Sequence, residues 1–242
     1  MSRSLFALAL LLSVAADAQP AGEPEPVGKP PAAQESILPA HDVAVSFGLG
    51  FELTPSSDGT TITNGVLRLN VAWAPLDWLE VSFLLPGVGV LLGTRHADEV
   101  LLSAGLDGIG YGSLEGLIVV PSADAAYRHW FSSATSLGAS ARWSSRYSQI
   151  PPQHQLTGSV FITHTFGKVV SLNFAVGGTR WWPSHWSGLI LGSGRLGFRS
   201  LPLFRVHLSP GWTIDLDAQL TLWLHPETRA EQQYLVGFTA IW

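Results

Sequence analysis

Charged side chains that could bind anions or pair with one another recur at alternate positions of short apolar segments. Arginine presents a planar guanidinium group that binds carboxylates and phosphates through paired hydrogen bonds. Period-two spacing places such residues on one face of a β-strand, opposite the apolar side chains. If the strands enclose a space, these charges either line an anion-attracting pore or form ion pairs that fill it. The candidate residues are Arg68, Glu80, Arg128, Arg142, Arg195, Arg199, Arg205, Asp215 and Asp217.

A histidine and a serine within residues 127–132 are the strongest catalytic candidates. His129 and Ser132 lie three residues apart in the sequence Tyr-Arg-His-Trp-Phe-Ser. This segment resembles outer-membrane lipid-hydrolysing barrels such as the lipid A deacylases, in which the serine follows the histidine by two residues on the same face. Here the serine falls on the opposite face, and no acidic partner is evident. We therefore expect no catalytic residue and no enzyme, and interpret the segment as part of an aromatic girdle at a membrane interface.

Glycines in one segment match a cofactor pattern. Gly192, Gly194 and Gly197 fit the G-x-G-x-x-G spacing of dinucleotide-binding sites. Such a site needs a buried strand before the glycines and a helix after them, and the sequence predicts neither. The chain has no cysteine, and its histidines show no close ligand spacing. We therefore expect neither a cofactor nor a metal ion, and place these glycines within a strand.

The densest aromatic patch contains Trp181, Trp182 and Trp186. Such rings could stack on a sugar or on a lipid headgroup. Clustered tryptophans more often anchor a barrel at the membrane interface. We interpret the patch as an interface anchor.

The composition indicates strands that face lipid. Charged residues make up 13% of the chain, against about 25% in a soluble domain, and hydrophobic residues make up 46%. No apolar run reaches the ~20 residues of a membrane helix. So few charges cannot cover a water-exposed surface, which favours an all-β transmembrane barrel with an apolar outer face. The net charge of −5 and the lack of a basic stripe argue against nucleic-acid binding.

The last nine residues show the clearest alternation in the chain. Apolar and aromatic residues occupy every second position and end on a tryptophan: Tyr234, Val236, Phe238, Ala240 and Trp242. This tail resembles the C-terminal signal of bacterial outer-membrane β-barrel proteins, which ends in Phe or Trp preceded by apolar residues at alternate positions. The resemblance implies recognition by the barrel assembly machinery and a location in the cell outer membrane, among its lipids.

The first 40 residues predict export and a spacer. Residues 1–18 have a short basic start, an apolar run and a small-residue cleavage site, as secretory signal peptides do. Residues 19–40 are rich in proline and poor in large apolar side chains, which predicts a disordered periplasmic leader. We therefore place the barrel at residues 41–242.

Short alternating segments separated by turn residues predict about ten antiparallel strands. Residues 99–131 could form one irregular strand or several, and residues 203–224 could form one long strand or a hairpin that turns at 209–211. Because closed bacterial barrels normally have an even strand count, eight and twelve are the alternatives to ten. The clearest segments are 43–53, 67–73, 79–85, 135–147, 154–166, 169–181, 187–199 and 231–242. The turns assigned to the periplasmic side, with both termini, are 74–77, 131–134, 167–168 and 200–203.

The expected function is that of a non-enzymatic integral outer-membrane barrel whose cellular role the sequence does not specify. A narrow lumen with both charge signs fits neither a wide porin nor a large adhesin. The alternative is a small passive channel or transporter for a small solute or ion, with an arginine-lined lumen. Loss of Arg142 and Arg199 should then change its ion preference. A lipid-modifying enzyme is the remote alternative, and the oligomeric state stays open.

Overall fold

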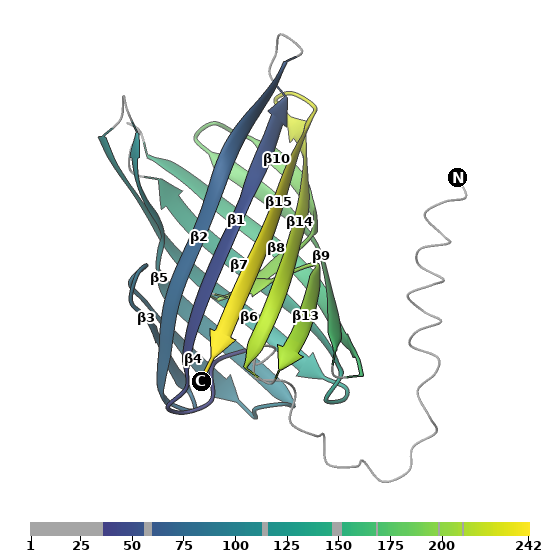
Figure 1. Ribbon diagram of the computed structural model, residues 1–242. Coiled ribbons are helices and arrows are strands. Elements are labelled where there is room, and N and C mark those ends of the chain that lie inside the picture. The colour runs from purple at the N-terminus through teal and green to yellow at the C-terminus, as the bar shows by residue number, and fades with distance from the viewer. Residues whose placement is uncertain are drawn as a thin grey trace, which may run out of the picture.

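The computed structural model describes residues 36–242, except 56–59, 113–115, 147–151, 168, 198 and 210. The chain forms an antiparallel β-barrel of 12 wall strands around a lumen (Figure 1). The predicted signal peptide at 1–18 and the predicted leader up to residue 35 lie outside the described residues. Within the described part, no helix has the length and apolar character needed to cross a bilayer.

The described strands build the wall and one internal hairpin. Neighbouring strands run antiparallel, and most wall neighbours are also neighbours in sequence. In chain order the strands are β1 (Val43–Pro55), β2 (Thr61–Leu76), β3 (Leu79–Ser82), β4 (Gly87–Gly93), β5 (Asp98–Gly112), β6 (Gly116–Trp130), β7 (Thr135–Arg146), β8 (Gln153–Phe166), β9 (Val170–Trp182), β10 (Ser187–Gly192), β11 (Gly194–Leu196), β12 (Arg199–Leu201), β13 (Phe204–Ser209), β14 (Trp212–His225) and β15 (Arg229–Ile241).

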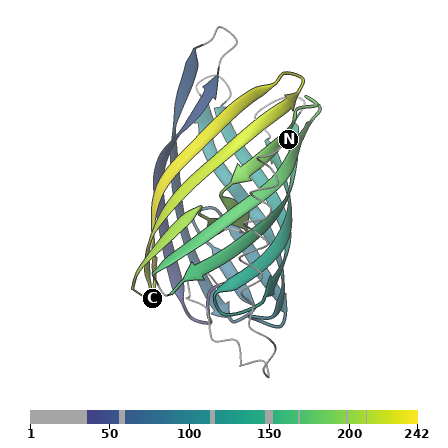
Figure 2. The same cartoon turned by 90° about the vertical axis from the view of Figure 1, so that its right-hand side faces the viewer.

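The first and last strands close the barrel beside the C-terminus. β1 pairs with β15 along most of its length. The amides of Val43 and Trp242 each donate to the other residue's carbonyl oxygen, at 2.8 and 3.0 Å. We call the rim that holds these two residues the C-terminal rim, and the opposite end the far rim. In Figure 2 the C-terminal rim lies at the bottom of the view.

The strand count corrects the predicted ten. Residues 79–93 form two short strands, β3 and β4, where the sequence predicts one strand and a glycine-rich stretch. The ambiguous residues 99–131 hold two long strands, β5 and β6. Each region adds one strand, so the barrel has 12. Gly87 and Gly89 obscure β4 in the sequence because glycine has no side chain to mark a face.

Residues 187–209 depart most from the prediction. β10 and β13 share one wall position between β9 and β14, with β10 towards the far rim and β13 towards the C-terminal rim. Residues 193–203 between them fold inwards as the β11–β12 hairpin, which is visible inside the barrel in Figure 2. The predicted strand 187–199 and the predicted turn at 200–203 are therefore wrong. Of the two possibilities for residues 203–224, the structure has the hairpin, because β13 ends at Ser209 and β14 begins at Trp212.

Side chains alternate between an apolar exterior and a polar interior. Large apolar residues on the outer face are exposed, including Leu49, Leu67, Val160 and Val236 at 54–64%. Buried polar side chains such as Thr163 face the lumen. An apolar exterior around a polar interior is the pattern of a transmembrane barrel, which confirms the fold class predicted from the alternation.

Candidate functional site

The lumen is divided by the hairpin that interrupts a wall strand. β10 ends at Gly192, whose φ of 115° turns the chain inwards, and Gly197 with φ of 59° lies in the hairpin turn. Positive φ values favour glycine, which has no Cβ atom. A Cβ atom at Gly192 would also collide with the Ala218 carbonyl oxygen. These glycines therefore build an internal hairpin, and not the continuous wall strand that the sequence predicts.

Two side chains complete the wall where the hairpin leaves and re-enters it. The Ser193 hydroxyl accepts hydrogen bonds from the amides of Leu203 and Ala218, at 3.0 and 2.9 Å. On the β9 side, the Asn173 side-chain amide donates to the Pro202 carbonyl oxygen at 2.7 Å. Unpaired backbone groups are costly within a membrane. Ser193 and Asn173 therefore supply the hydrogen bonds that an uninterrupted strand would make.

One face of the hairpin is apolar and packs against the β5–β9 side of the wall. Leu196 and Leu201 are 1% and 5% exposed, and they form a buried cluster with Leu101, Phe161 and Ala175. Burying a leucine side chain contributes about 1.5–3 kcal/mol. The hairpin is therefore a packed element of the interior.

Polar side chains of the hairpin bind other parts of the wall. Arg199 donates to the Glu80 carboxylate on β3 at 3.0 Å. The Ser200 hydroxyl donates to Asp217 on β14 at 2.9 Å. Arg68 on β2 lies 3.2 Å from the same aspartate. The structure thus brings these four predicted charges together across the lumen.

Two further ion pairs fill the interior. Arg205 and Asp215 form a buried bidentate pair, with nitrogen–oxygen distances of 2.7 and 2.8 Å. Arg142 lies 3.5 Å from Asp124. Bidentate geometry fixes the orientation of both partners. These pairs correspond to the interlocked interior that the sequence offers as one of two readings.

The last two predicted arginines occupy different environments. Arg128 lies near the C-terminal end of β6, is 1% exposed, and stacks over the Trp130 ring at 3.9 Å. Arg195 projects from the hairpin, where the charges of Asp124 and Asp217 attract it. The predicted set is therefore spread over several ion-paired groups and does not form one ring.

Residues 36–40 pack inside the C-terminal rim. Leu38 is fully buried, and its amide donates to the Glu80 carboxylate at 2.9 Å. The Ser36 hydroxyl donates to Glu99. Glu80 therefore holds both this segment and the hairpin. Residues 36–40, at the end of the predicted disordered leader 19–40, therefore contact the barrel interior, and the first wall strand begins at Val43.

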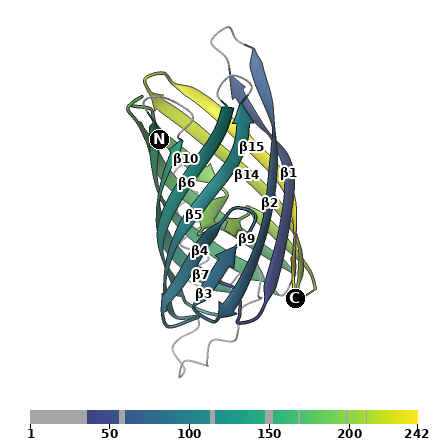
Figure 3. The ribbon, with the colours of Figure 1, turned by 90° about the vertical axis from the view of Figure 1, so that its left-hand side faces the viewer.

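The wall is incomplete between β2 and β5 towards the far rim. The paired part of β3 and β4 ends at Ser82 and Gly87. Figure 3 shows both strands ending well below the tops of β2 and β5. With strands about 4.8 Å apart, the loss of two strands leaves a gap of roughly 14 Å between the axes of their neighbours. This gap is called the lateral opening below.

The edge of β2 faces the lateral opening with unpaired backbone groups. The last backbone contact between β2 and the β3 chain is the hydrogen bond from the Phe83 amide to the Val71 carbonyl oxygen, at 2.9 Å. Because hydrogen-bonding direction alternates along a strand, the backbone groups of Leu69 and Leu67 point to the same side. Among the described residues, no strand pairs with this side of β2 over residues 61–70. Within an apolar belt such groups need a polar partner.

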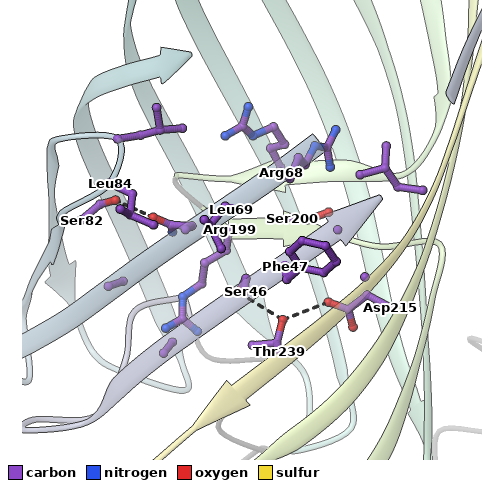
Figure 4. A pocket seen from close by; sticks show the side chains of 18 of the residues that line it. Ser46, Phe47, Arg68, Leu69, Ser82, Leu84, Arg199, Ser200, Asp215 and Thr239 are labelled. Carbon is purple, nitrogen blue, oxygen red and sulfur yellow. Dashed lines mark hydrogen bonds between the residues drawn. The ribbon is translucent and has the colours of Figure 1, made fainter. Parts of the chain in front are cut away.

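A cavity of about 370 Å³ joins the lumen to the lateral opening (Figure 4). Arg68, Arg199 and Asp215 are among its inner lining residues. Its outer lining includes Leu67 and Leu69 on the lipid-facing side of β2, which are 64% and 44% exposed. The cavity therefore connects a charged interior with an apolar rim on the outer face of the barrel.

The segment that suggested lipid hydrolysis has an acidic neighbour. His129 Nδ1 lies 2.9 Å from Asp98 Oδ1 on the adjacent strand β5, and the Tyr127 hydroxyl donates to the same carboxylate. The expectation that His129 lacks an acidic partner is wrong. Ser132 accepts hydrogen bonds from amides of the following turn, including that of Thr135. In the part of the chain that is described, no three His, Asp or Glu side chains are grouped to hold a metal ion.

The predicted assembly-signal residues follow the alternation of the last strand. Phe238 packs against Trp212, with ring centroids 5.0 Å apart. Ala240 is buried, whereas the tryptophan at the chain end is exposed. Recognition of these residues by the assembly machinery stays a prediction. The five residues are Tyr234, Val236, Phe238, Ala240 and Trp242.

The architecture defines the class of protein as a closed antiparallel β-barrel with the apolar exterior of a transmembrane barrel, as outer-membrane proteins have. No protein-family model and no curated protein matches the sequence. Among solved structures, a loop L8 deletion mutant of OmpT, an outer membrane protein of Vibrio cholerae, is 6% identical with a TM-score of 0.39, over 83% of this chain and 98% of that chain. Ail, the attachment invasion locus protein of Yersinia pestis, is 12% identical with a TM-score of 0.30, over 84% and 99%. A deltaS2 mutant of the monoaromatic hydrocarbon channel TodX is 8% identical with a TM-score of 0.36, over 88% and 91%. These values carry no information about the function of this chain.

Sequence reasoning missed the residues that shape the hairpin and the opening. Leu67 and Leu69 read as ordinary lipid-facing residues because the free edge of β2 depends on how far β3 and β4 extend. Ser193 and Asn173 read as ordinary interior residues. The glycines of residues 192–197 and Pro202 are the local signals, since proline cannot donate a hydrogen bond to a neighbouring strand and marks an interruption.

Proposed function

We propose that this chain is a non-enzymatic outer-membrane barrel that binds small anionic amphiphiles and exchanges them with the bilayer through the lateral opening. The observation that supports this best is the cavity that runs from the lipid-facing leucines of β2 to the charged lumen. A bound amphiphile would place its apolar tail against Leu67 and Leu69 and its head group beside Arg68.

The barrel axis is the less favourable route for a solute. The hairpin crosses the lumen, with its leucines packed on one wall and Arg199 paired with Glu80 on the other. Residues 36–40 cover the C-terminal rim from inside. A solute on the axis would have to displace both elements, whereas the lateral route begins at an existing gap in the wall.

The lining of the cavity favours an anionic head group. Arg68 is the accessible cation, because its side chain is 38% exposed while its partner Asp217 is 11% exposed. A carboxylate or phosphate can accept paired hydrogen bonds from such a guanidinium group. The arginines in the lining outnumber the carboxylates: Arg68, Arg195, Arg199 and Arg205 against Glu80, Asp215 and Asp217.

We also propose that the barrel lies in the outer membrane with a defined orientation. The C-terminal rim faces the periplasm, so that the assembly machinery reaches residues 234–242 and the leader stays on the same side. The lateral opening, which lies towards the far rim, then meets the outer leaflet. The lipids of that leaflet are the immediate neighbours of Leu67 and the natural source of an amphiphile.

Displacement of a fluorescent fatty acid tests this proposal. The full chain in lipid nanodiscs is titrated with 11-(dansylamino)undecanoate, and the bound probe is displaced with dodecanoate or with uncharged dodecanol. Leu67→Trp narrows the rim and is expected to weaken dodecanoate binding about 5–10-fold, or ~1 kcal/mol. Arg68→Gln is expected to weaken dodecanoate about tenfold and leave dodecanol nearly unchanged, since only the charged head group uses the guanidinium.

Leu49→Trp is the matched control for the rim variant. Leu49 lies opposite Leu67 in the β1–β2 pairing and is also lipid-facing, but it does not line the cavity. Equal weakening of dodecanoate binding by Leu49→Trp and Leu67→Trp would contradict the proposal. So would the absence of saturable binding by the wild-type chain.

Planar-bilayer recording separates this function from the arginine-lined channel. We expect the wild-type chain to be electrically silent, because the hairpin and residues 36–40 occupy the axis. Stepwise anion-selective openings that change on replacement of Arg142 and Arg199 would instead favour the channel.

A further inference from the structure

A second cavity, of about 500 Å³, lies towards the far rim and shares no lining residue with the first, although its Gln233 accepts a hydrogen bond from Arg68 at 3.2 Å. Strands β8, β9, β14 and β15 supply most of its wall. Its polar lining is dominated by uncharged side chains that carry both donors and acceptors. The amides among them are Gln153, Gln155, Gln219, Gln232 and Gln233.

Three tryptophans form a cluster in this cavity. Trp223 contacts Trp186 with ring centroids 5.5 Å apart at 84°, and Trp181 with centroids 6.4 Å apart at 70°. Trp182, one residue further along β9, instead packs against His154 on the outer face. The structure therefore divides the aromatic patch predicted as an interface anchor, because consecutive strand residues point to opposite faces.

Buried donors without acceptors concentrate around the same cavity. Over the described residues, four such atoms belong to its lining: Nε1 of Trp181, Oγ of Ser184, Nε1 of Trp223 and Nε of Arg229. Trp223 is only 6% exposed. Buried polar atoms are normally hydrogen-bonded. Several unpaired donors at one cavity match a ligand that carries many acceptor oxygens. Small rotations of these side chains would bring the donors within reach of that ligand.

We propose that this cavity binds a neutral saccharide of about disaccharide size. Sugar hydroxyls donate and accept hydrogen bonds, which suits an amide-rich wall, and indole rings pack on the apolar faces of sugar rings. The cation in the lining does not favour an anion, because Arg229 already pairs with Glu231 at 2.6 Å and stacks over Trp186 at 4.2 Å. The volume falls within the ~300–1,000 Å³ of small-ligand sites.

Two sources share this chemistry: a free sugar, and the sugar portion of a surface glycolipid. The site differs from the amphiphile cavity in its place and in its ligand. A negative result for saccharide binding therefore leaves the proposed binding of amphiphiles undecided, and the reverse also holds.

Intrinsic tryptophan fluorescence of the full chain tests the site directly. The protein is kept in lauryldimethylamine oxide, a detergent without a sugar head group. It is titrated with maltose, cellobiose and lactose, and in a second series with lipopolysaccharide carrying a complete or a truncated core. We expect a saturable change with at least one of these probes.

Two neighbouring variants supply the matched comparison. Trp181→Phe keeps an aromatic ring but removes the Nε1 donor, and is expected to weaken binding about 5–10-fold. Trp182→Phe changes the ring on the outer face and is expected to leave binding unchanged.

The outcomes are distinct. Saturation by a free disaccharide that is lost in Trp181→Phe assigns the site to soluble sugar, and saturation only by complete-core lipopolysaccharide assigns it to the glycolipid. Absence of saturation with every probe, or equal losses in both variants, would overturn the proposal. Retained heat-modifiable migration on gels verifies that each variant is folded.

Discussion

The wall from β6 to β9 and the wall from β2 to β5 share one side-chain alternation but differ in how completely their backbones pair. β7 and β8 pair from Thr135–His164 to Arg146–Gln153, which is nearly their full length. β2 and β3 pair only near the C-terminal rim, beginning at Ala72. The complete arc offers a support on which the hairpin leucines pack. The interrupted arc leaves backbone groups and a cavity available to a ligand.

Inside the lumen, the contacts that the hairpin makes with the two arcs also differ in chemistry. Beside the complete arc, the hairpin meets Ala126, Phe161 and Ala175 in an apolar cluster. Beside the interrupted arc, it meets Glu80 through Arg199. Stability is therefore concentrated on one side of the barrel and binding capacity on the other.

Removal of the hairpin should have the largest effect. Replacement of residues 194–201 by two glycines, combined with deletion of residues 36–40, withdraws both elements that occupy the axis. We expect stepwise ion currents in planar bilayers, against a silent wild-type chain. Leu196→Ala is the control, because it keeps the hairpin in place and should cost about 2–5 kcal/mol of stability without opening the axis. Silence of the deletion variant in its folded state would contradict the proposed block.

Truncations in the two arcs should differ in stability. Phe161→Ala removes a side chain that is 2% exposed beneath the hairpin, and is expected to lower the free energy of unfolding by about 3–5 kcal/mol. Leu84→Ala at the lateral opening, where the side chain is 47% exposed, should cost under about 1 kcal/mol. Urea unfolding in lipid vesicles, followed by tryptophan fluorescence, measures both. Similar losses would show that the two arcs contribute equally.

Substitution of the glycine at which the chain turns into the hairpin should produce a smaller difference in stability. Gly192→Ala places a Cβ atom at a φ of 115° against the Ala218 carbonyl oxygen, which should destabilise the barrel by about 1–3 kcal/mol. Gly158→Ala is the matched control, because its Cβ atom would meet only the Ser140 carbonyl oxygen at 3.9 Å. Unfolding by urea compares the two variants. Equal stability of both would mean that the chain leaves the wall without strain.

The sequence predicts the barrel class because alternation depends on local spacing alone. It fails at residues 187–209 because a hairpin alternates with the same period as the wall: Arg195 and Leu196 look like wall residues although they lie inside the lumen. The strand that a segment pairs with can lie far away in the chain. Alternation of apolar and polar residues does not identify that partner.

The candidate site was predicted in part. Alternation places Arg205 and Asp215 in the interior correctly, and both form the ion pair that mixed charges suggest. The contact between Arg199 and Glu80 could not be predicted, because it crosses the lumen from an unrecognised hairpin. The lateral opening arises from the short lengths of β3 and β4, and the glycines of β4 conceal that strand in the sequence.

Amide hydrogen exchange of the lipid-embedded barrel, resolved residue by residue by NMR, tests the central claim most directly. The claim is that the β2 edge is open while the β8–β9 wall is closed. We predict that the amides of Leu67 and Leu69 exchange at least ~100-fold faster than those of Val160 and Val176, which lie in the paired wall. Equal protection at all four amides would mean that β2 is paired along its length, and would contradict the lateral opening.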